Sequence, residues 1–180
     1  CLQGIAVAEP SSPADGMAQA TALLGEQKYA EALALLQPLE NDEKQLHQVR
    51  LLEGQCYLGL KQTDKALALY QSLAGDAPDP IKLTALQALG SIHLAAGDLA
   101  QAEESLRAAN DLYVTAEDAR LKGLGSTQYF RTRLDYDGAV RYACGQLRQL
   151  ATAYEKQGKV AEAAGLYRQV CDTYPEYPGA

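Results

Sequence analysis

Residues that could carry out chemistry are few in this chain and widely separated. There are two histidines, His47 and His93, and they fall in different predicted helical segments. The chain contains no Cys-x-x-Cys pair, no His-Glu-x-x-His motif and no glycine-rich phosphate loop. Adjacent acids such as Glu103 and Glu104 point to different sides of a helix, so they make a poor acid and base couple. We therefore expect no catalytic residues, no metal site and no cofactor, and we do not expect an enzyme.

Two of the four cysteines are candidates for a disulfide. Cys144 lies near the start of one predicted helix and Cys171 lies near the end of the following one. Antiparallel packing of two such helices brings these ends together, and a disulfide needs Cα atoms about 4.4–6.8 Å apart. The alternative is two buried thiols. Cys56 directly precedes the large residue Tyr57 and is expected to be a buried thiol.

The N-terminal residues allow two export interpretations. In the first, Cys1 is the lipid-bearing residue of a bacterial lipoprotein and residues 2–13 form a flexible tether. In the second, residues 2–8 are the tail of a secretory signal that is cut before Glu9. Both predict a location in the bacterial cell envelope, either periplasmic or at the outer membrane. A third alternative gives residue 1 no export meaning, which leaves a cytoplasmic location open.

The elements that would position these residues are predicted to be helices. In residues 51–58 the apolar side chains recur at helical spacing, with a small notch at Gly54. A second apolar stripe begins near Thr63 and runs to Leu73. Each stripe needs a partner, and the short connection makes its neighbour the natural one. The two segments are therefore expected to form an antiparallel helical hairpin.

This hairpin recurs along the chain. Ala66 lies 34 residues after Ala32, and both stand in similar segments, KALALYQSL and EALALLQPL. Each such alanine has a small residue twelve positions earlier and a large one nine positions earlier, a spacing that suits closely crossing helices. The alanines are Ala32, Ala66, Ala102 and Ala163, the small residues are Ala20, Gly54, Gly90 and Ala151, and the large residues are Leu23, Tyr57, His93 and Tyr154.

With Pro78 and Pro175 each twelve residues after an alanine, this pattern resembles the tetratricopeptide repeat family. The resemblance implies an all-α fold, a right-handed α-solenoid of antiparallel helix pairs with about four to five repeats, the fourth of them degenerate. We expect a tether or signal remnant at 1–12, a tetratricopeptide-like helical domain at 13–175 and a C-terminal tail at 176–180.

Capping and breaking residues predict where the helices begin and end. Pro38 should bend or shorten the last turn of its helix. Asp98 and Gln101 form a capping-box pattern. The repeat loses its period beyond Asn110, where Thr115 suggests a fresh helix start. The expected helices are Pro13 to about Leu24, Tyr29 to about Glu40, Asn41 or Asp42 to Gly59, a helix starting near Thr63, Asp79 to Ala96, one starting at Asp98, Ala116 to Phe130, Tyr136 to Gln157 and Val160 to about Thr173.

Charge is unevenly distributed in this chain of 180 residues and net charge −7. Residues 1–115 hold 15 acids and 7 bases, and residues 116–180 hold 8 acids and 9 bases. An acidic majority argues against nucleic acid as a partner, since phosphate binding needs clustered cations. A basic cluster in the irregular segment could dock an acidic partner or anionic lipid heads, although intramolecular pairing is the commoner explanation. It comprises Arg120, Lys122, Arg131, Arg133, Arg141 and Arg148.

The family resemblance also implies a partner-binding groove lined by the first helices of the repeats. Its amides and hydroxyls could bind the backbone of an extended peptide, and its leucines could take apolar side chains. The sites that would hold a C-terminal carboxylate in some relatives are Gln, Leu, Thr and Ser here, which disfavours that specificity. The groove residues are expected to be Thr21, Leu24, Gln48, Leu51, Gln55, Leu58, Thr84, Gln87, Ser91 and Leu94.

These features favour a non-enzymatic scaffold for protein–protein interaction. We expect it to bind a peptide or helix of a partner and to assist assembly of a bacterial envelope complex such as a pilus, a secretion system or outer-membrane machinery. Membrane contact is expected only through a lipid at Cys1. The alternative is a small acidic chaperone of secreted proteins in the cytoplasm. An enzyme that uses the helices only as support would need a catalytic domain that these residues do not provide.

Overall fold

The computed structural model describes residues 13–42, 45–121 and 144–173. The chain divides into two compact units, residues 1–77 and residues 78–180, and each is described by itself. Every regular element in the described ranges is helical. The predicted all-α class of consecutive helical hairpins is therefore confirmed. The predicted tether at 1–12 and tail at 176–180 lie outside the described residues.

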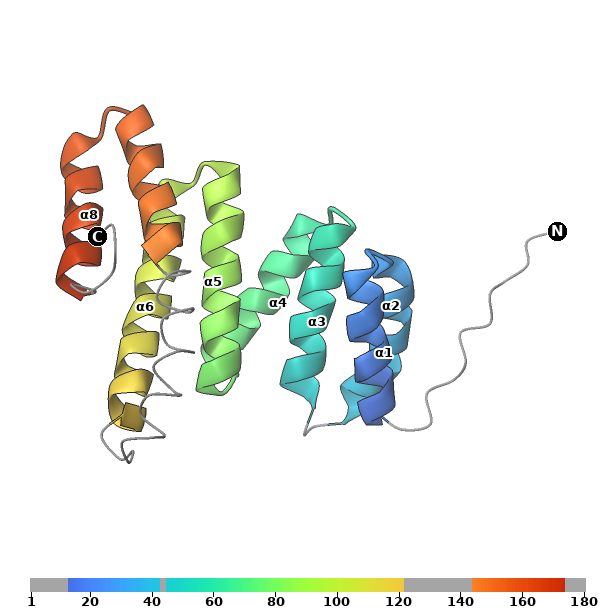
Figure 1. Ribbon diagram of the computed structural model, residues 1–180. Helices are drawn as coiled ribbons and strands as arrows, with labels where there is room; N and C mark the ends of the chain where they lie inside the picture. Colours follow the sequence, from blue (N-terminus) through green and yellow to red (C-terminus); the bar gives the residue numbers. More distant parts are fainter. Residues whose placement is uncertain (1–12, 43–44, 122–143, 174–180) are drawn as a thin grey trace. The chain divides into compact units, whose positions relative to one another are not determined.

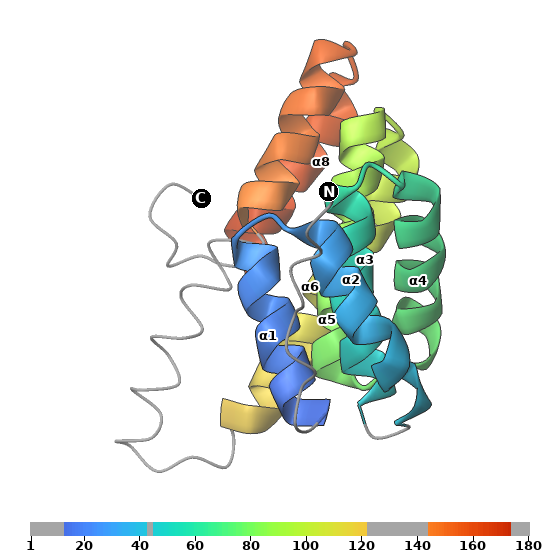
Figure 2. The same cartoon turned by 90° about the vertical axis from the view of Figure 1, so that its right-hand side faces the viewer.

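The first unit contains two helical hairpins. The first hairpin consists of α1 (Pro13–Gly25) and α2 (Tyr29–Leu36), followed by the 3₁₀ helix η1 (Gln37–Asn41). The second consists of α3 (Leu46–Gly59) and α4 (Thr63–Asp76). Neighbouring helices in each hairpin run antiparallel (Figures 1 and 2). The apolar core between them is contributed by α1, α2, η1 and α3, with Ala20, Ala32, Leu36, Leu39, Val49, Leu52 and Cys56 all buried.

The second unit contains α5 (Asp79–Ala96), α6 (Leu99–Leu121), helical residues 144–156 and α8 (Val160–Thr173). The hairpin of α5 and α6 is visible in Figure 1. One apolar cluster joins α6, helix 144–156 and α8. It contains Leu99, Ala102, Leu106, Cys144, Leu147, Leu150, Ala151, Tyr154, Ala163, Leu166 and Val170.

The same turn joins the helices of four hairpins, which is the clearest sign of the repeat. In each turn one residue adopts a positive φ, and the next N–H donates to a carbonyl five residues earlier, as in a Schellman motif. The acceptor carbonyls belong to the four large residues that the sequence pattern picked out. The positive-φ residues are Gln27, Lys61, Gly97 and Gly158, and the bonds run from Lys28 to Leu23, Gln62 to Tyr57, Asp98 to His93 and Lys159 to Tyr154, at 2.8–2.9 Å.

The small residues of the pattern allow close helix crossing, as predicted. All four of them, and the four alanines of the pattern, are buried. A β-carbon at Gly54 would lie 2.6 Å from Cζ of Tyr70. At Gly90 a β-carbon would collide with the side chain of Leu106. The absence of a side chain at these positions is therefore what lets α3 approach α4, and α5 approach α6.

Several predicted helix ends are confirmed. The first helix begins at Pro13, α5 spans Asp79–Ala96, and Gly97 ends it with φ 82°. The helix containing Leu36 changes to 3₁₀ geometry at Gln37, one residue before Pro38. The Gln101 N–H donates to Asp98 Oδ1 at 3.4 Å, so the predicted cap is present.

Two predicted boundaries are wrong. Helix α3 begins at Leu46 rather than at Asn41 or Asp42, because Asn41 completes η1. Helix α6 continues without a break to Leu121, so the predicted fresh start at Thr115 does not occur. No glycine or proline lies between Leu99 and Leu121, and the buried side chain of Asn110 is accommodated within the helix.

Candidate functional site

The two histidines lie on different helices, one in each unit of the structure. His47 lies on α3 in the first unit and His93 lies on α5 in the second. In residues 13–42, 45–121 and 144–173, no three His, Cys, Asp or Glu side chains come together as a group that could hold a metal ion.

The predicted disulfide between Cys144 and Cys171 is absent, since both thiols are free. Cys144 is fully buried in the core, whereas Cys171 is exposed. The physical reason is the helical register: Val170 occupies the buried position, and the next residue points about 100° away, toward solvent. Cys56 is a buried thiol, as expected, and burial raises its pKa to about 11. Cys1 lies outside the described residues.

The predicted groove residues of the first unit differ in accessibility. Gln48 and Gln55 are exposed on α3, and Leu58 is half-buried. Leu51 is only 7% exposed and belongs to the core, so its assignment to the groove is wrong. Leu51 stands at the same offset before Gly54 as Gln87 before Gly90, but its apolar side chain packs into the core of the first unit instead of staying accessible.

The two predicted groove residues on α1 are engaged locally. The Thr21 hydroxyl is exposed but donates to the Met17 carbonyl at 2.8 Å. Leu24 is half-buried against the core of the first unit. Their part in binding a partner stays a prediction.

The predicted groove residues of the second unit lie on α5. The Thr84 hydroxyl donates to the Pro80 carbonyl at 3.0 Å, and the Ser91 hydroxyl donates to the Gln87 carbonyl at 3.0 Å. Ser91 also accepts a hydrogen bond of 2.9 Å from Gln146 Nε2. Ser91 therefore joins α5 to helix 144–156.

An open cleft of about 530 Å³ lies between α5 and helix 144–156. Helix α5 contributes Leu94 to the lining of the cleft, and helix 144–156 contributes all the other lining residues. The lining combines apolar side chains, an amide, a hydroxyl and two cations. Its residues are Leu94, Gly145, Arg148, Gln149, Thr152, Ala153 and Lys156.

Sequence reasoning reached Leu94 but missed the rest of this cleft. Gly145, Arg148 and Thr152 stand at the same offsets from Ala151 as Thr84, Gln87 and Ser91 stand from Gly90. The groove pattern therefore continues into the last repeat, and extending it past the irregular segment would have found these residues. Arg148 was noted only as part of a basic cluster, whose other members, Arg120, Lys122, Arg131, Arg133 and Arg141, have no described side chains.

A hydrogen-bonded network holds helix 144–156 in place. The buried Tyr154 hydroxyl donates to Glu103 Oε2 at 2.8 Å and lies 3.3 Å from the Leu99 carbonyl. Glu103 also pairs with Arg107 at 2.8 Å, and Arg107 in turn donates to Gln169 on α8. Burial, reinforced by the bond to Glu103, raises the pKa of Tyr154 to about 12. The cleft is therefore built on a helix that is bonded to α6 through Tyr154 and to α5 through Gln146.

A buried acid in the first unit was also missed. Glu53 on α3 is 3% exposed, and its Oε1 has no hydrogen-bond partner among the described residues. Burial raises the pKa of Glu53 to about 7, the neighbouring Glu40 acts in the same direction through a hydrogen bond and its charge, and Arg50 opposes them. The sequence contained a signal for this buried acid. Glu53 directly precedes Gly54, whereas the residues that directly precede the matching Gly90 and Ala151 are the apolar Leu89 and Leu150.

Two parts of this chain match models of known protein families. Residues 147–177 match the tetratricopeptide repeat family. Residues 2–73 match the family described as anaphase-promoting complex, cyclosome, subunit 3. Together with the four equivalent turns, these matches identify the chain as a tetratricopeptide-repeat protein. No curated protein sequence matches the chain significantly.

Solved structures of MamA are similar to this chain at low sequence identity. One, from AMB-1, is 16% identical, with 93% of this chain and 94% of that chain covered and a TM-score of 0.48. A MamA substitution mutant is 17% identical, with 89% and 96% covered and a TM-score of 0.48.

None of the helices that the structure describes combines the length and the apolar character that a bilayer crossing requires.

Proposed function

We propose that this protein is a non-enzymatic scaffold that binds a segment of a partner protein along the first helices of its repeats. The observation that carries the proposal is the cleft between α5 and helix 144–156. It opens at positions that the repeat register assigns to the groove, and it combines an apolar floor with side chains that can bond a peptide backbone. Its volume suits a few residues of an extended chain.

Site-specific photo-crosslinking tests this proposal. A photoreactive amino acid replaces Thr152, which lines the cleft, or Ala164, which is exposed on α8 and is not part of it. In cells of the native host, a discrete protein adduct from position 152 and none from position 164 would support the proposal. Equal adducts from both positions, or none from position 152, would contradict it.

We also propose that the protein acts in a bacterial cell envelope and assists assembly of a complex there. The support is Cys1 as a candidate lipid acceptor, and the partner would then be an envelope protein. The test is the intact mass of the protein purified from its native host. A diacyl or triacyl increment on Cys1 is the expected result, whereas an unmodified cysteine preceded by further uncleaved residues would favour the cytoplasmic alternative.

A further inference from the structure

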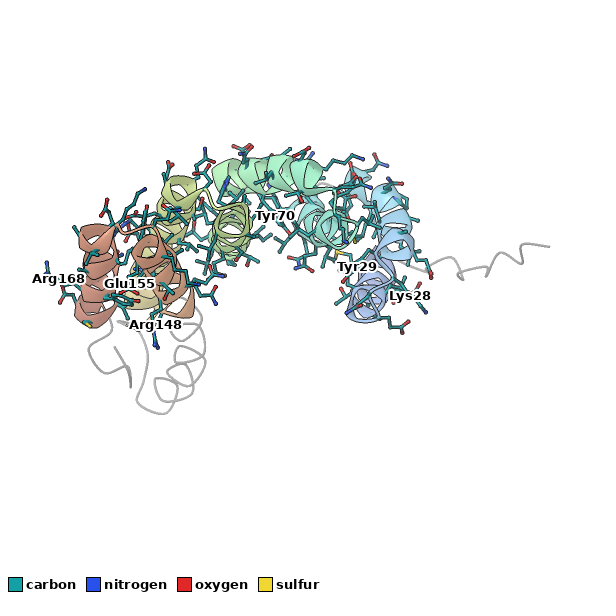
Figure 3. All side chains as sticks on the ribbon, turned by 90° about the horizontal axis from the view of Figure 1, so that it is seen from above. Lys28, Tyr29, Tyr70, Arg148, Glu155 and Arg168 are labelled. Carbon is teal, nitrogen blue, oxygen red and sulfur yellow. The ribbon has the colours of Figure 1, made fainter. Side chains whose placement is uncertain are left out.

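The cleft in the second unit has a distinctive charge. Two of its lining residues, Arg148 and Lys156, are cations with exposed side chains, and none of its lining residues is an acid. Neither cation forms an ion pair with another described residue. Figure 3 shows Arg148 pointing away from its helix. A local positive site on a protein of net charge −7 is available to a negatively charged ligand.

The spacing of the two cations limits the ligand's shape. Lys156 follows Arg148 by eight residues on one helix, which separates their Cα atoms by about 12 Å along the axis. An extended peptide advances about 3.3 Å per residue. Two carboxylates about three or four residues apart in an extended segment would therefore reach both cations.

The residues between the cations suit the middle of such a segment. Thr152 lies halfway along the same stripe, and Gln149 supplies an amide. Leu94 and Ala153 provide apolar surface that can receive one aliphatic side chain of the ligand. The cleft thus presents two charged ends around an apolar and hydrogen-bonding centre.

The helix that carries the cations is fixed before any ligand arrives. Leu147, Leu150 and Ala151 on its opposite face are buried in the core. Gln146 bonds to Ser91 at 2.9 Å, and Tyr154 bonds to Glu103 at 2.8 Å. Binding of a ligand therefore costs little conformational entropy in the protein, which favours affinity.

Residues 122–143 of this chain have the wrong net charge to bind in the cleft. Residues 122–143 contain four cations, namely Lys122, Arg131, Arg133 and Arg141, and two acids, Asp135 and Asp137. A net positive segment would be repelled by Arg148 and Lys156. An acidic segment of another protein is the complementary choice.

We propose that the cleft between α5 and helix 144–156 selects an extended acidic segment of a partner protein, with carboxylates three or four residues apart meeting Arg148 and Lys156 and an aliphatic residue between them meeting Leu94. This inference rests on the proposed function and adds the chemical class of the partner segment.

The test uses the full chain and three synthetic peptides labelled with a fluorophore. The first has the pattern Glu-x-Leu-x-Glu, the second replaces both glutamates by glutamine, and the third replaces them by lysine. Fluorescence anisotropy measures binding to the wild-type protein, to an Arg148→Glu/Lys156→Glu variant, and to an Arg168→Glu control. Arg168 is exposed on α8 and does not line the cleft.

The acidic peptide should bind the wild-type protein on the order of tenfold more tightly than the glutamine peptide, and the preference should shrink at high salt. The double variant should lose the acidic peptide and gain the lysine peptide, while the control keeps the wild-type order. Equal binding of the acidic and glutamine peptides would overturn the acidic specificity. So would the failure of every peptide to bind at about 1 mM, a concentration that detects even weak complexes.

Photo-crosslinking separates the failure of this inference from the failure of the proposed function. An adduct specific to position 152 combined with equal binding of the peptides would retain the scaffold and reject the acidic segment. Dimerisation of the wild-type chain that the double variant abolishes would assign the cleft to a second copy and would also overturn the inference.

Discussion

Gly54 and the ring of Tyr70 are in such close contact that a β-carbon at position 54 would lie 2.6 Å from the ring carbon Cζ. Tyr70 is fully buried, so its ring is enclosed by the side chains around it. The pair fixes how closely α3 and α4 approach. In the first hairpin the equivalent residues are Ala20 and Leu36, and both are fully buried.

The Gly54→Ala substitution should therefore destabilise the protein. We expect a loss of about 1–3 kcal/mol in the free energy of unfolding, the usual cost of overpacking a core, measured by urea denaturation. Adding Tyr70→Leu recreates the alanine and leucine pair of the first hairpin, so the double variant should recover part of the loss of Gly54→Ala. If the two effects simply added, the proposed contact would be wrong.

The buried Glu53 should make stability depend on pH. Because the pKa of Glu53 is raised from 4.5 to about 7 in the folded state, folding favours its protonated form. The stabilisation that protonation provides is complete below about pH 4.5, declines as the pH rises through 7, and is lost above that value. In Glu53→Gln this contribution should disappear, so the variant should gain stability relative to wild type as the pH rises from 5 to about 8. Thermal unfolding across that range measures the difference.

The control for this experiment is Glu31→Gln on the exposed side of α2. It should follow the wild-type pH dependence closely. A second variant, Glu53→Leu, copies the residue found at the matching positions Leu89 and Leu150. It should be more stable than wild type at pH 8, since a buried carboxylate is replaced by an apolar side chain. Lower stability of both Glu53 variants at pH 8 would contradict the assignment.

The four equivalent turns provide a test of backbone strain. Lys61 adopts φ 59°, where the matching residues Gly97 and Gly158 are glycine. Lys61→Gly should raise the free energy of unfolding by about 0.5–1 kcal/mol, because glycine adopts this conformation without a steric penalty. The reverse change, Gly97→Ala, should lower it by about 1 kcal/mol, although a β-carbon there would meet nothing within 4 Å. The decisive result is that Lys61→Gly and Gly97→Ala change the free energy of unfolding in opposite directions, as measured by urea denaturation.

The Tyr154 hydroxyl should contribute measurably to stability. Tyr154→Phe removes the bond to Glu103 and leaves that carboxylate with one donor fewer, at an expected cost of about 1–2 kcal/mol. Tyr167→Phe is a matched control, since its hydroxyl makes only a 3.4 Å contact with Thr152 at an exposed site. Its cost should stay below about 0.5 kcal/mol. If the two variants lost the same free energy of unfolding, the proposal that the Tyr154 hydroxyl holds helix 144–156 in place would be wrong.

Cysteine reactivity checks the correction to the predicted disulfide. In a Cys1→Ser background, Cys171 should react quickly with a thiol reagent in the native protein because it is exposed. Cys56 and Cys144 should react only on unfolding, since burial hides both thiols and raises the pKa of each. Three thiols released by denaturation without a reductant would confirm that no bridge exists. Only one would show that Cys144 and Cys171 are paired.

The repeat and its packing residues could be predicted because they depend on local rules. A helix has 3.6 residues per turn, so small and large residues at fixed offsets from Ala66 must fall on one face. The same rules gave the ends at Pro13, Gly59 and Ala96. They failed beyond Asn110, where Thr115 resembles a helix start although no glycine or proline interrupts the helix before Leu121.

The candidate site could be predicted only in part. The offsets that placed Gln87 and Ser91 in a groove apply equally to Arg148 and Thr152, but the irregular spacing before Ala151 concealed the last repeat's contribution. Leu51 was assigned to the groove because helical spacing identifies a stripe without saying which neighbour covers it. Its burial depends on helices that pack from outside its own segment.

By itself, then, the sequence determined the helical class, the repeating hairpin and the residues that let its helices cross, because helix formation and close packing within a hairpin involve neighbours in the chain. Tertiary structure alone decided the features that need residues distant in sequence. These are the cleft between Leu94 and Arg148, the separate environments of Cys144 and Cys171, and the buried carboxyl group of Glu53 beside Glu40. Each depends on which face of a helix a neighbouring helix covers, and that is settled only when the whole core packs.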